Sequence, residues 1–484
     1  MNIVDPIIFQ ARMNPDGLAI CTPGTAPESV SYRQLDHIMN NIARRALWEG
    51  LKSGDRVAIA VKEKIFHAAI ILALTRLGIV TVSARSPTIP KELGVNAVIT
   101  DTAASFENAG TVIVADLGWT QGDGKPMADR QVYQGKEDDV CRIILTSGTT
   151  GESKGVAFTH NMVTDRIGRH FFIKGNRFSN ASRIYCDLGL GSAPAFQFLF
   201  YSLTRGGSIF FYGDSAESTV QAFELYKIQN MFAAPSGLAE YLQFFENFPE
   251  FQCSFDHITT GGGLLSKSLC ERVQARMTPI VYSSYGATEA CTVACAPSTA
   301  ITKIPGAVGW VMPDVTVEIV DEAGRARASG KEGLIRVRSR YVAKGYFGDP
   351  PGAQSLRDGW FYPGDLGYLN GDDMLVVLGR DNAVLNVKGD KVAPEIVEEA
   401  IMSFGAIIDA AVFTRMSDLG IPELYAAIVC RSAINEDALR AHCGPRLERA
   451  FLPVRFIQVD KIPRNEMGKI ERHRLQEVAK VQGS

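Results

Sequence analysis

Residues 57–82 read VAIAVKEKIFHAAIILALTRLGIVTV, and this stretch decides the fold class. Residues 57–61 form a short apolar run that is typical of a buried strand. Residues 65–77 have the length and composition of a helix, and Gly78 then turns the chain into a second apolar run at 79–82. Strand, helix and strand in this order predict a βαβ unit, the building block of a parallel sheet covered by helices.

The same pattern returns twice further along the chain. Apolar runs at 209–212 and 231–234 flank one helical pattern, and runs at 258–260 and 280–282 flank another. In parallel sheets, ligands bind in crevices beyond the carboxyl ends of the strands. We therefore expect the loops that follow these strands to share one cleft.

Beyond these units the pattern changes. Short strands at 334–337 and 375–378 lie between glycine-rich turns and predict an antiparallel part. The last hundred residues predict a small α+β module with a helix from Pro394, since proline favours the first helical turn. The predicted fold is α/β: a large N-terminal domain, 1–379, of helix-covered, mainly parallel sheets plus a small antiparallel part, and a small mobile α+β C-terminal domain, 380–484.

Composition narrows the function. The 484 residues carry a net charge of −3, which argues against nucleic acid as a partner. The nine cysteines include no CxxC pair and fit reduced thiols better than a disulfide framework. The start resembles no signal peptide, and Arg76 and Gly78 interrupt the longest apolar stretch, 68–84. We therefore expect a cytoplasmic protein with no membrane span.

The sharpest local motif follows the apolar run at 142–145 and reads TSGTTGESKG, residues 146–155. Its glycines let backbone N–H groups approach phosphate oxygens, its hydroxyls add donors, and Lys154 adds a positive charge. Gly155 stands where the Walker loop of P-loop kinases and GTPases needs a Ser or Thr for Mg²⁺, which argues against that class. The motif therefore predicts a loop that binds nucleotide phosphates.

At this point the chain resembles the adenylate-forming superfamily of acyl-CoA synthetases, adenylation domains and luciferases. Further segments of that family follow in its order. Residues 285–289 match its Y-G-x-T-E segment, and 359–365 resemble its aromatic segment that ends in Gly-Asp. Residues 379–382 resemble its domain-joining segment, and 463–469 resemble its C-terminal lysine motif. The resemblance also includes residues 31–35, so it covers essentially the whole chain.

The resemblance implies roles for individual residues. Attack of a carboxylate on ATP brings two anions together, so the site must offset their charge. Glu289 would hold Mg²⁺ and Thr288 would donate to the α-phosphate, although alone this pair would equally fit a helix cap. Asp365 and Arg380 would bind the ribose, and Lys469 would bridge the substrate carboxylate and the α-phosphate. The predicted ATP site also includes Thr146, Ser147, Gly148, Thr149, Thr150, Gly151, Lys154, Gly262, Tyr285, Gly286 and Ala287.

In this family a thiol then takes the acyl group after the C-terminal domain rotates about a hinge. The hinge position here is Asn382, where relatives commonly have aspartate or lysine; asparagine tolerates unusual backbone angles, so rotation is still expected. The turn at Lys388 and Gly389 would line the channel for coenzyme A. Lys391 would contact the phosphates of coenzyme A, with a solvated lysine as an equal alternative.

The acyl site departs from the family pattern. Many relatives have a proline and an aromatic residue or histidine in the segment that reads DLGLGS here, residues 187–192, and the small Gly191 stands near that aromatic position. A lysine or arginine for a second carboxylate is not evident, which disfavours a dicarboxylate and favours an aromatic or medium aliphatic acid. The predicted pocket walls are Gly191, Ala234, Ser236, Gly261 and Gly263.

Three interpretations follow from the sequence. The leading one is an acid–thiol ligase that uses ATP, Mg²⁺ and coenzyme A and releases AMP and pyrophosphate. The second is a free-standing adenylation enzyme that loads a separate carrier protein. The third is a nucleotide-binding pseudoenzyme, and the presence of Lys154, Glu289, Asp365 and Lys469 argues against it. The acid and the oligomeric state are left open.

Overall fold

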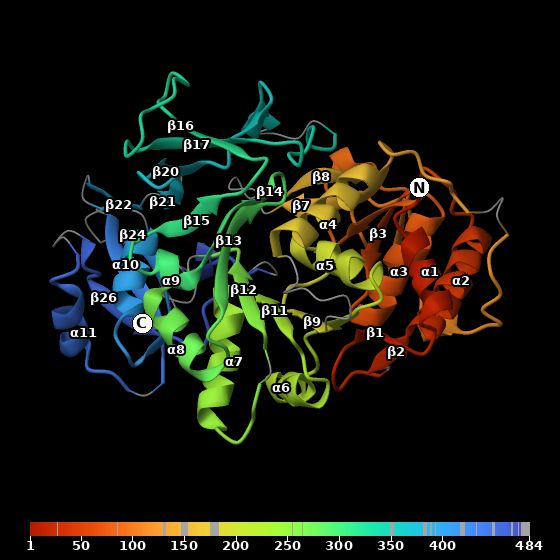
Figure 1. Ribbon diagram of the computed structural model, residues 1–484, viewed down its shortest axis with the longest axis horizontal. Helices are drawn as coiled ribbons and strands as arrows, with labels where there is room; N and C mark the ends of the chain where they lie inside the picture. Colours follow the sequence, from red (N-terminus) through yellow and green to blue (C-terminus); the bar gives the residue numbers. More distant parts are fainter. Residues whose placement is uncertain are drawn as a thin grey trace.

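The computed structural model arranges the described residues in four β-sheets with helices between and around them (Figure 1). The described residues are 1–26, 28–84, 86–128, 132–146, 153–174, 183–253, 255–263, 265–348, 353–380, 385–387, 390–392, 394–416, 422–431, 433–447, 451–465, 468–472 and 474–475. None of the helices within these ranges is both long and apolar enough to cross a membrane.

A six-stranded sheet is built around the first predicted βαβ unit. Its strands, in spatial order, are β6 (Thr111–Val114), β5 (Ala97–Thr100), β3 (Arg56–Ala60), β4 (Val80–Ser83), β7 (Val140–Thr146) and β8 (Lys154–Thr159). Neighbouring strands run parallel except β7 and β8, which form an antiparallel hairpin. The phosphate-loop motif, residues 146–155, begins at the last residue of β7 and ends in the first residues of β8.

A fifteen-stranded sheet contains both of the other predicted units and the antiparallel part. From β2 to β18 its strands are β2 (Ser29–Ser31), β1 (Leu18–Cys21), β10 (Ser208–Phe211), β9 (Arg183–Cys186), β11 (Asn230–Ala233), β12 (His257–Gly261), β13 (Val281–Ala287), β14 (Cys291–Pro297), β15 (Ala307–Val311), β21 (Met374–Arg380), β20 (Asp365–Leu369), β17 (Gly333–Arg338), β19 (Trp360–Phe361) and β18 (Leu356–Arg357), with β16 (Thr316–Val320) beside β17. The strands from β1 to β13 run parallel, and those from β13 onward run antiparallel. The predicted parallel and antiparallel parts are therefore one continuous sheet.

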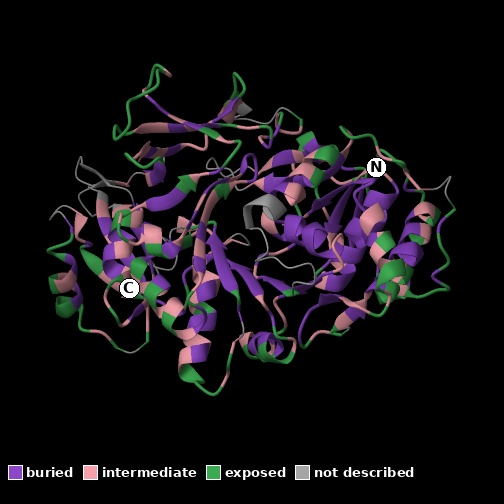
Figure 2. Cartoon of the chain, in the orientation of Figure 1, coloured by how far each residue is buried: buried purple, intermediate pink, exposed green. Residues whose placement is uncertain are grey.

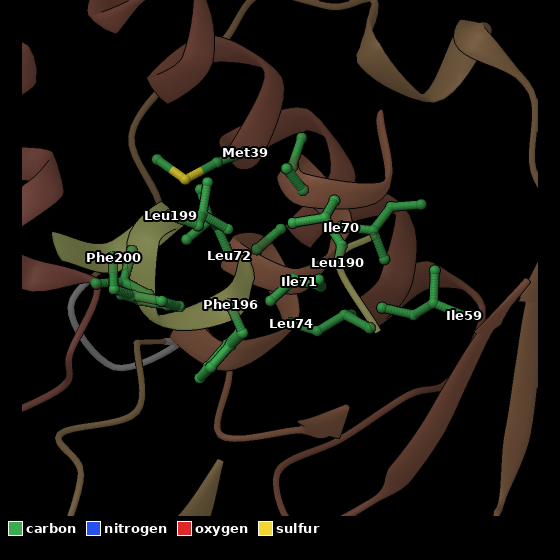
Figure 3. Close-up of a cluster of buried hydrophobic side chains, with 14 of the residues drawn as sticks. Met39, Ile59, Ile70, Ile71, Leu72, Leu74, Leu190, Phe196, Leu199 and Phe200 are labelled. Carbon is green, nitrogen blue, oxygen red and sulfur yellow. The ribbon is translucent and has the colours of Figure 1, made fainter. Parts of the chain in front are cut away.

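Helices cover both sheets and fill the space between them. They are α1 (Asp5–Met13), α2 (Tyr32–Trp48), α3 (Lys64–Arg76), α4 (His160–Lys174), α5 (Ala193–Leu203), α6 (Ala216–Leu225), α7 (Pro235–Asn247), α8 (Lys267–Arg276), α9 (Ser298–Ile301), α10 (Pro394–Met402) and α11 (Glu436–Cys443). Helix α3 is apolar on nearly every side because it is buried along most of its length. Figure 2 shows this buried interior, and Figure 3 shows Leu72 of α3 beside Leu199 of α5 within one cluster.

The C-terminal residues form the predicted α+β unit. Strand β22 (Leu385–Val387) pairs with β23 (Asp390–Val392), and a second sheet contains β24 (Ile407–Met416), β25 (Pro422–Cys430) and β26 (Arg455–Gln458). Helix α10 begins at Pro394, as predicted. Two hydrophobic clusters are built entirely from residues of this unit, so it has a core of its own. The boundary between 379 and 380 stays a prediction.

Candidate active site

The two ends of the phosphate-loop motif meet across the β7–β8 hairpin. Thr146 ends β7, Lys154 begins β8, and the two residues are direct partners in the antiparallel register. The hydroxyl of Thr146 donates to the carbonyl oxygen of Lys154 at 3.4 Å. The intervening predicted residues, Ser147, Gly148, Thr149, Thr150 and Gly151, lie outside the described part of the chain.

Thr288 and Glu289 lie in the tight connection between β13 and β14, and not at the start of a helix. Arg166 of α4, which is fully buried, holds this connection in place. Its guanidinium donates to the carbonyl oxygens of Thr288 at 3.0 Å and Glu289 at 3.2 Å. Because buried cations need partners, these bonds hold Arg166 and the backbone of the turn in one geometry.

Tyr346 connects Glu289 to the phosphate loop. Its hydroxyl donates to Glu289 Oε1 at 2.8 Å, and Lys154 Nζ lies 5.3 Å from the centre of its ring. Burial and the charge of Glu289 raise the pKa of Tyr346, so the phenol stays protonated and acts as a donor. The sequence gives little signal for this residue beyond an aromatic in a glycine-rich segment.

Glu289 is suited to hold Mg²⁺ with help from a nucleotide. Among the described residues, no group of three or more His, Cys, Asp or Glu side chains could hold a metal ion. Mg²⁺ is often held by one or two carboxylates plus substrate phosphates, and it keeps several waters. A single oriented carboxylate beside a phosphate loop therefore fits this ion, with the phosphates as its other ligands.

Asp365, Arg380 and Tyr285 form a tight cluster at the junction of three strands. Asp365 begins β20 and faces Arg380, the last residue of β21, in the antiparallel register. Arg380 Nε lies 3.2 Å from Asp365 Oδ1, and the Tyr285 hydroxyl donates to Asp365 Oδ2 at 2.5 Å. Burial and the Asp365 charge raise the pKa of Tyr285, which keeps its hydroxyl a donor. The carboxylate is thus oriented from both sides, and the Asp365 residue is only 6% exposed.

Lys469 reaches the same region from the C-terminal unit. It follows a tight turn in which Asn465 Oδ1 accepts the Lys469 backbone N–H at 3.1 Å. The Asn465 backbone N–H donates back to the Lys469 carbonyl oxygen at 2.9 Å. Two bonds between the same residues close the turn and set where the lysine side chain starts.

One cavity collects these separate segments. The predicted residues that line it are Thr146, Lys154, Gly261, Gly262, Gly286, Ala287, Thr288, Glu289, Asp365, Arg380 and Lys469. Tyr285 supports the cavity through Asp365 and is not itself among the lining residues. Four separate elements meet at this cavity: the β7–β8 hairpin, the β13–β14 connection, the β20–β21 pair and the segment before Lys469. This arrangement is expected of a nucleotide-activating site.

Comparison with known proteins identifies the family. The profile of the family described as "AMP-binding enzyme" matches residues 9–347 of the 484. The chain belongs to this family. A 2-succinylbenzoate–CoA ligase of Bacillus velezensis is 27% identical over 98% of each chain. The 4-coumarate–CoA ligase 4 of Arabidopsis thaliana is 27% identical over 93% of this chain and 86% of that protein.

Solved structures agree on the fold of this AMP-binding enzyme. The anthranilate CoA ligase AuaEII, in complex with anthranoyl-AMP, superimposes with a TM-score of 0.86 at 18% identity. The alignment covers 100% of this chain and 98% of the ligase. The arrangement of the sheets and of the C-terminal unit is therefore that of an adenylate-forming enzyme, as the motifs predict.

The rest of the cavity wall was not predicted. It is formed by residues of α5, of the parallel strands that end at the cavity, of β14, of the loops near 188 and 346, and of the segment 355–363 that contains β18 and β19. These residues are Leu188, Ala193, Pro194, Gln197, Phe198, Phe232, Thr259, Ser284, Cys291, Thr292, Cys295, Tyr346, Ser355, Phe361, Tyr362 and Pro363. Because they are scattered over the sequence, only the strand order brings them together.

The predicted acyl-pocket residues divide in two. Gly261 lines the cavity, whereas Gly191, Ala234, Ser236 and Gly263 are not among its described lining residues. Ala234 and Ser236 do not line the cavity because they flank Pro235, the first residue of α7, and so belong to the start of that helix. The first turn of the helix faces the C-terminal unit, where it meets the backbone of Gly468. Gly191 lies in the turn between β9 and α5.

The residues predicted for the hinge and for coenzyme A remain predictions. Asn382, Lys388 and Gly389 lie outside the described residues. Lys391 lies on β23, and its side chain is likewise outside the described part.

Proposed function

We propose that this AMP-binding enzyme activates a carboxylic acid with ATP, forming acyl-AMP and pyrophosphate, and then transfers the acyl group to coenzyme A. The observation that carries the proposal is the convergence of Lys154, Glu289, Asp365 and Lys469 on one cavity. Each serves a different part of the same reaction. A pseudoenzyme that only bound a nucleotide would have no use for the C-terminal lysine in this cavity.

The residues divide the chemistry as follows. Asp365, held by Tyr285 and Arg380, presents a carboxylate that accepts hydrogen bonds from ribose hydroxyls. Lys154 and the hairpin hold the phosphates, and Glu289 holds Mg²⁺, which offsets phosphate charge. The Lys469 ammonium lies between the attacking carboxylate and the α-phosphate and lowers the repulsion between them. The relatives named as CoA ligases support coenzyme A as the thiol.

The remainder of the cavity suits an uncharged acyl group. The cationic side chains among its described lining residues are Lys154, Arg380 and Lys469, and all three serve the nucleotide end. The other end combines the Phe198 and Phe232 rings, whose centroids are 5.2 Å apart, with neutral polar groups. We therefore propose an aromatic or medium aliphatic monocarboxylic acid. The relatives are named for 2-succinylbenzoate and 4-coumarate, which are both aromatic acids and support an aromatic substrate; 2-succinylbenzoate carries two carboxylates, so the restriction to a monocarboxylate rests on the cavity lining alone.

We also place the enzyme in the cytoplasm. All nine cysteines are free thiols, and five of them are buried in the large N-terminal part. Free thiols in this number fit a reducing compartment.

The test is ATP–pyrophosphate exchange over paired acids that differ only in a second carboxylate, such as benzoate with phthalate and hexanoate with adipate. Each acid is assayed with and without coenzyme A, and products are identified by mass spectrometry. We expect exchange with the monocarboxylates and an acyl-CoA product. Exchange that favours the dicarboxylates would contradict the proposed substrate class. Acyl-AMP that coenzyme A does not discharge would contradict the proposed acceptor and point to a carrier protein.

A further inference from the structure

The position of Lys469 depends on how the C-terminal unit rests against the large N-terminal part. The C-terminal unit has a hydrophobic core of its own, so the packing inside this unit does not decide where it lies on the N-terminal part. Contacts between the two parts must therefore place Lys469 in the cavity. Helix α7 of the N-terminal part meets this unit at both of its ends, and it also contacts β24. Figure 1 shows the C-terminal elements, in blue, on the side of the molecule where α7 and α8 lie.

The first turn of α7 contacts Gly468, the residue that precedes Lys469. Gly468 has a φ of +73°, and a Cβ at this position would lie 2.6 Å from Ala234 Cβ and 3.3 Å from Ser236 Oγ. Only a glycine allows both this backbone angle and this approach. Since Lys469 is the next residue, the contact fixes the start of the catalytic side chain relative to the cavity.

The last turn of α7 carries an ion pair to the same unit. Glu246 Oε2 lies 2.7 Å from Arg431 Nη2 of the C-terminal unit and 2.7 Å from Arg272 Nη2 of α8. Arg272 Nε donates to Glu246 Oε1 at 3.0 Å, so the carboxylate is already oriented within the N-terminal part. The 13 residues of α7 span about 20 Å. Contacts at both ends of the helix fix the orientation of the C-terminal unit, whereas a single contact would let that unit rotate about it.

The first turn of α7 is itself held in place by Asp187. The carboxylate of Asp187 lies against the first turn of α7, where a Cβ on Gly237 would come within 1.9 Å of Oδ2. Tyr241 of α7 donates its hydroxyl to Asp187 Oδ1 at 2.9 Å, and a carboxylate near a helix N-terminus is favourable.

Arg464, which belongs to the C-terminal unit, holds Gly468 in place from within that unit. Its guanidinium donates to the Gly468 carbonyl oxygen at 2.8 Å and to Asp409 Oδ1 at 2.8 Å. Asp409 lies on β24 at a register shift in its pairing with β25. The turn is therefore held to the sheet of the C-terminal unit and moves with it as one body.

From these contacts we propose that α7 is the docking helix that places Lys469 for acyl-AMP formation, with Gly468 and Arg431 as positioning residues. The inference rests on the proposed function, because it assigns α7 to the first half-reaction. The second half-reaction, in which coenzyme A attacks acyl-AMP, has no carboxylate–phosphate repulsion for Lys469 to offset. Weakening the contacts of α7 with the C-terminal unit should therefore slow acyl-AMP formation and leave the transfer to coenzyme A nearly unchanged.

The decisive variant is Gly468→Ala, assayed separately for acyl-AMP formation and for discharge of chemically prepared acyl-AMP by coenzyme A. Because the methyl group meets Ala234 and the φ angle is strained, we expect acyl-AMP formation to fall by at least about tenfold. Discharge should change by less than about threefold. Adding Ala234→Gly removes the carbon that the new methyl meets, so the double variant should regain part of the lost rate.

Arg431→Ala tests the other end of α7. The pair is partly exposed, with side-chain exposures of 35% and 27%, so we expect a loss in acyl-AMP formation of about two- to fivefold that is smaller at high salt. Arg33→Ala is the matched control, because Arg33 forms an exposed ion pair with Asp16 away from α7. This control should keep both half-reactions at the wild-type rate.

Hydrogen exchange tests docking without relying on activity. In Gly468→Ala and Arg431→Ala, peptides covering 233–247 should exchange faster than in the wild type, while peptides of β25 stay unchanged. Equal losses in both half-reactions, or unchanged exchange in α7, would overturn the docking role. A wild-type enzyme that forms no acyl-AMP from any acid would instead overturn the proposed function, and the exchange result would still decide on docking.

Discussion

Removing the Tyr285 hydroxyl should weaken ATP binding while leaving the acid site intact. In Tyr285→Phe the ring stays in its hydrophobic cluster, and only the bond to Asp365 Oδ2 at 2.5 Å is lost. A hydrogen bond to a charged group contributes about 1.5–3 kcal/mol, which corresponds to roughly a 10- to 150-fold change in affinity. We expect the lower end, an increase in the KM for ATP of about tenfold, because Arg380 still holds Asp365 Oδ1.

The assay is pyrophosphate exchange with ATP varied at saturating acid, then with acid varied at saturating ATP. The KM for the acid should change by less than about threefold. Tyr282→Phe is the matched control, since Tyr282 lies on the same strand but is not among the described lining residues, and its ring packs against His257. A rise in the KM for the acid with an unchanged KM for ATP would refute the assignment of Asp365 to the ribose.

Three further outcomes are expected. Lys469→Ala should slow acyl-AMP formation by about 100-fold or more while ATP binding, measured by calorimetry, survives; normal formation would refute its role. Arg166→Met leaves the carbonyl oxygens of Thr288 and Tyr341 without the guanidinium that donates to them, so the Tm in scanning calorimetry should fall by about 5 °C, and an unchanged Tm would contradict this. Burial lowers the pKa of His67 from 6.5 to about 3, so the unfolded chain binds the extra proton first as the pH falls below 6.5. Stability should therefore drop by up to about 1.4 kcal/mol per pH unit between pH 6.5 and 3, and His67→Gln should flatten that slope in urea unfolding at pH 7, 5.5 and 4.5; an equal slope in both proteins would count against it.

Local patterns were sufficient to predict the first βαβ unit. Residues 57–82 contain apolar runs of strand length on both sides of a helix-length run, and they form β3, α3 and β4 within two residues of the predicted bounds. The continuity of the parallel and antiparallel parts was not predictable, because strand order depends on pairing between distant segments. Only the structure shows that β13 joins the two parts.

The candidate site was predictable to the extent that motifs name its residues. Asp365 and Arg380 stand in separate motifs, and their direct pairing follows from the β20–β21 register, which sequence spacing does not reveal. Tyr346 and Arg166 carry no motif, since one is an aromatic in a loop and the other is one of several cations on α4. Their roles come from burial and from the groups they meet.

The largest hydrophobic cluster has a consequence for how the molecule melts. It joins Ile59 and Ile99 of the six-stranded sheet to Ile209 and Phe232 of the fifteen-stranded sheet, whereas the C-terminal unit keeps separate clusters. Heating should therefore melt the two large sheets in one cooperative step and the C-terminal unit in another. The same division makes that unit a module that evolution can exchange or retune on its own, while the two large sheets have to change together.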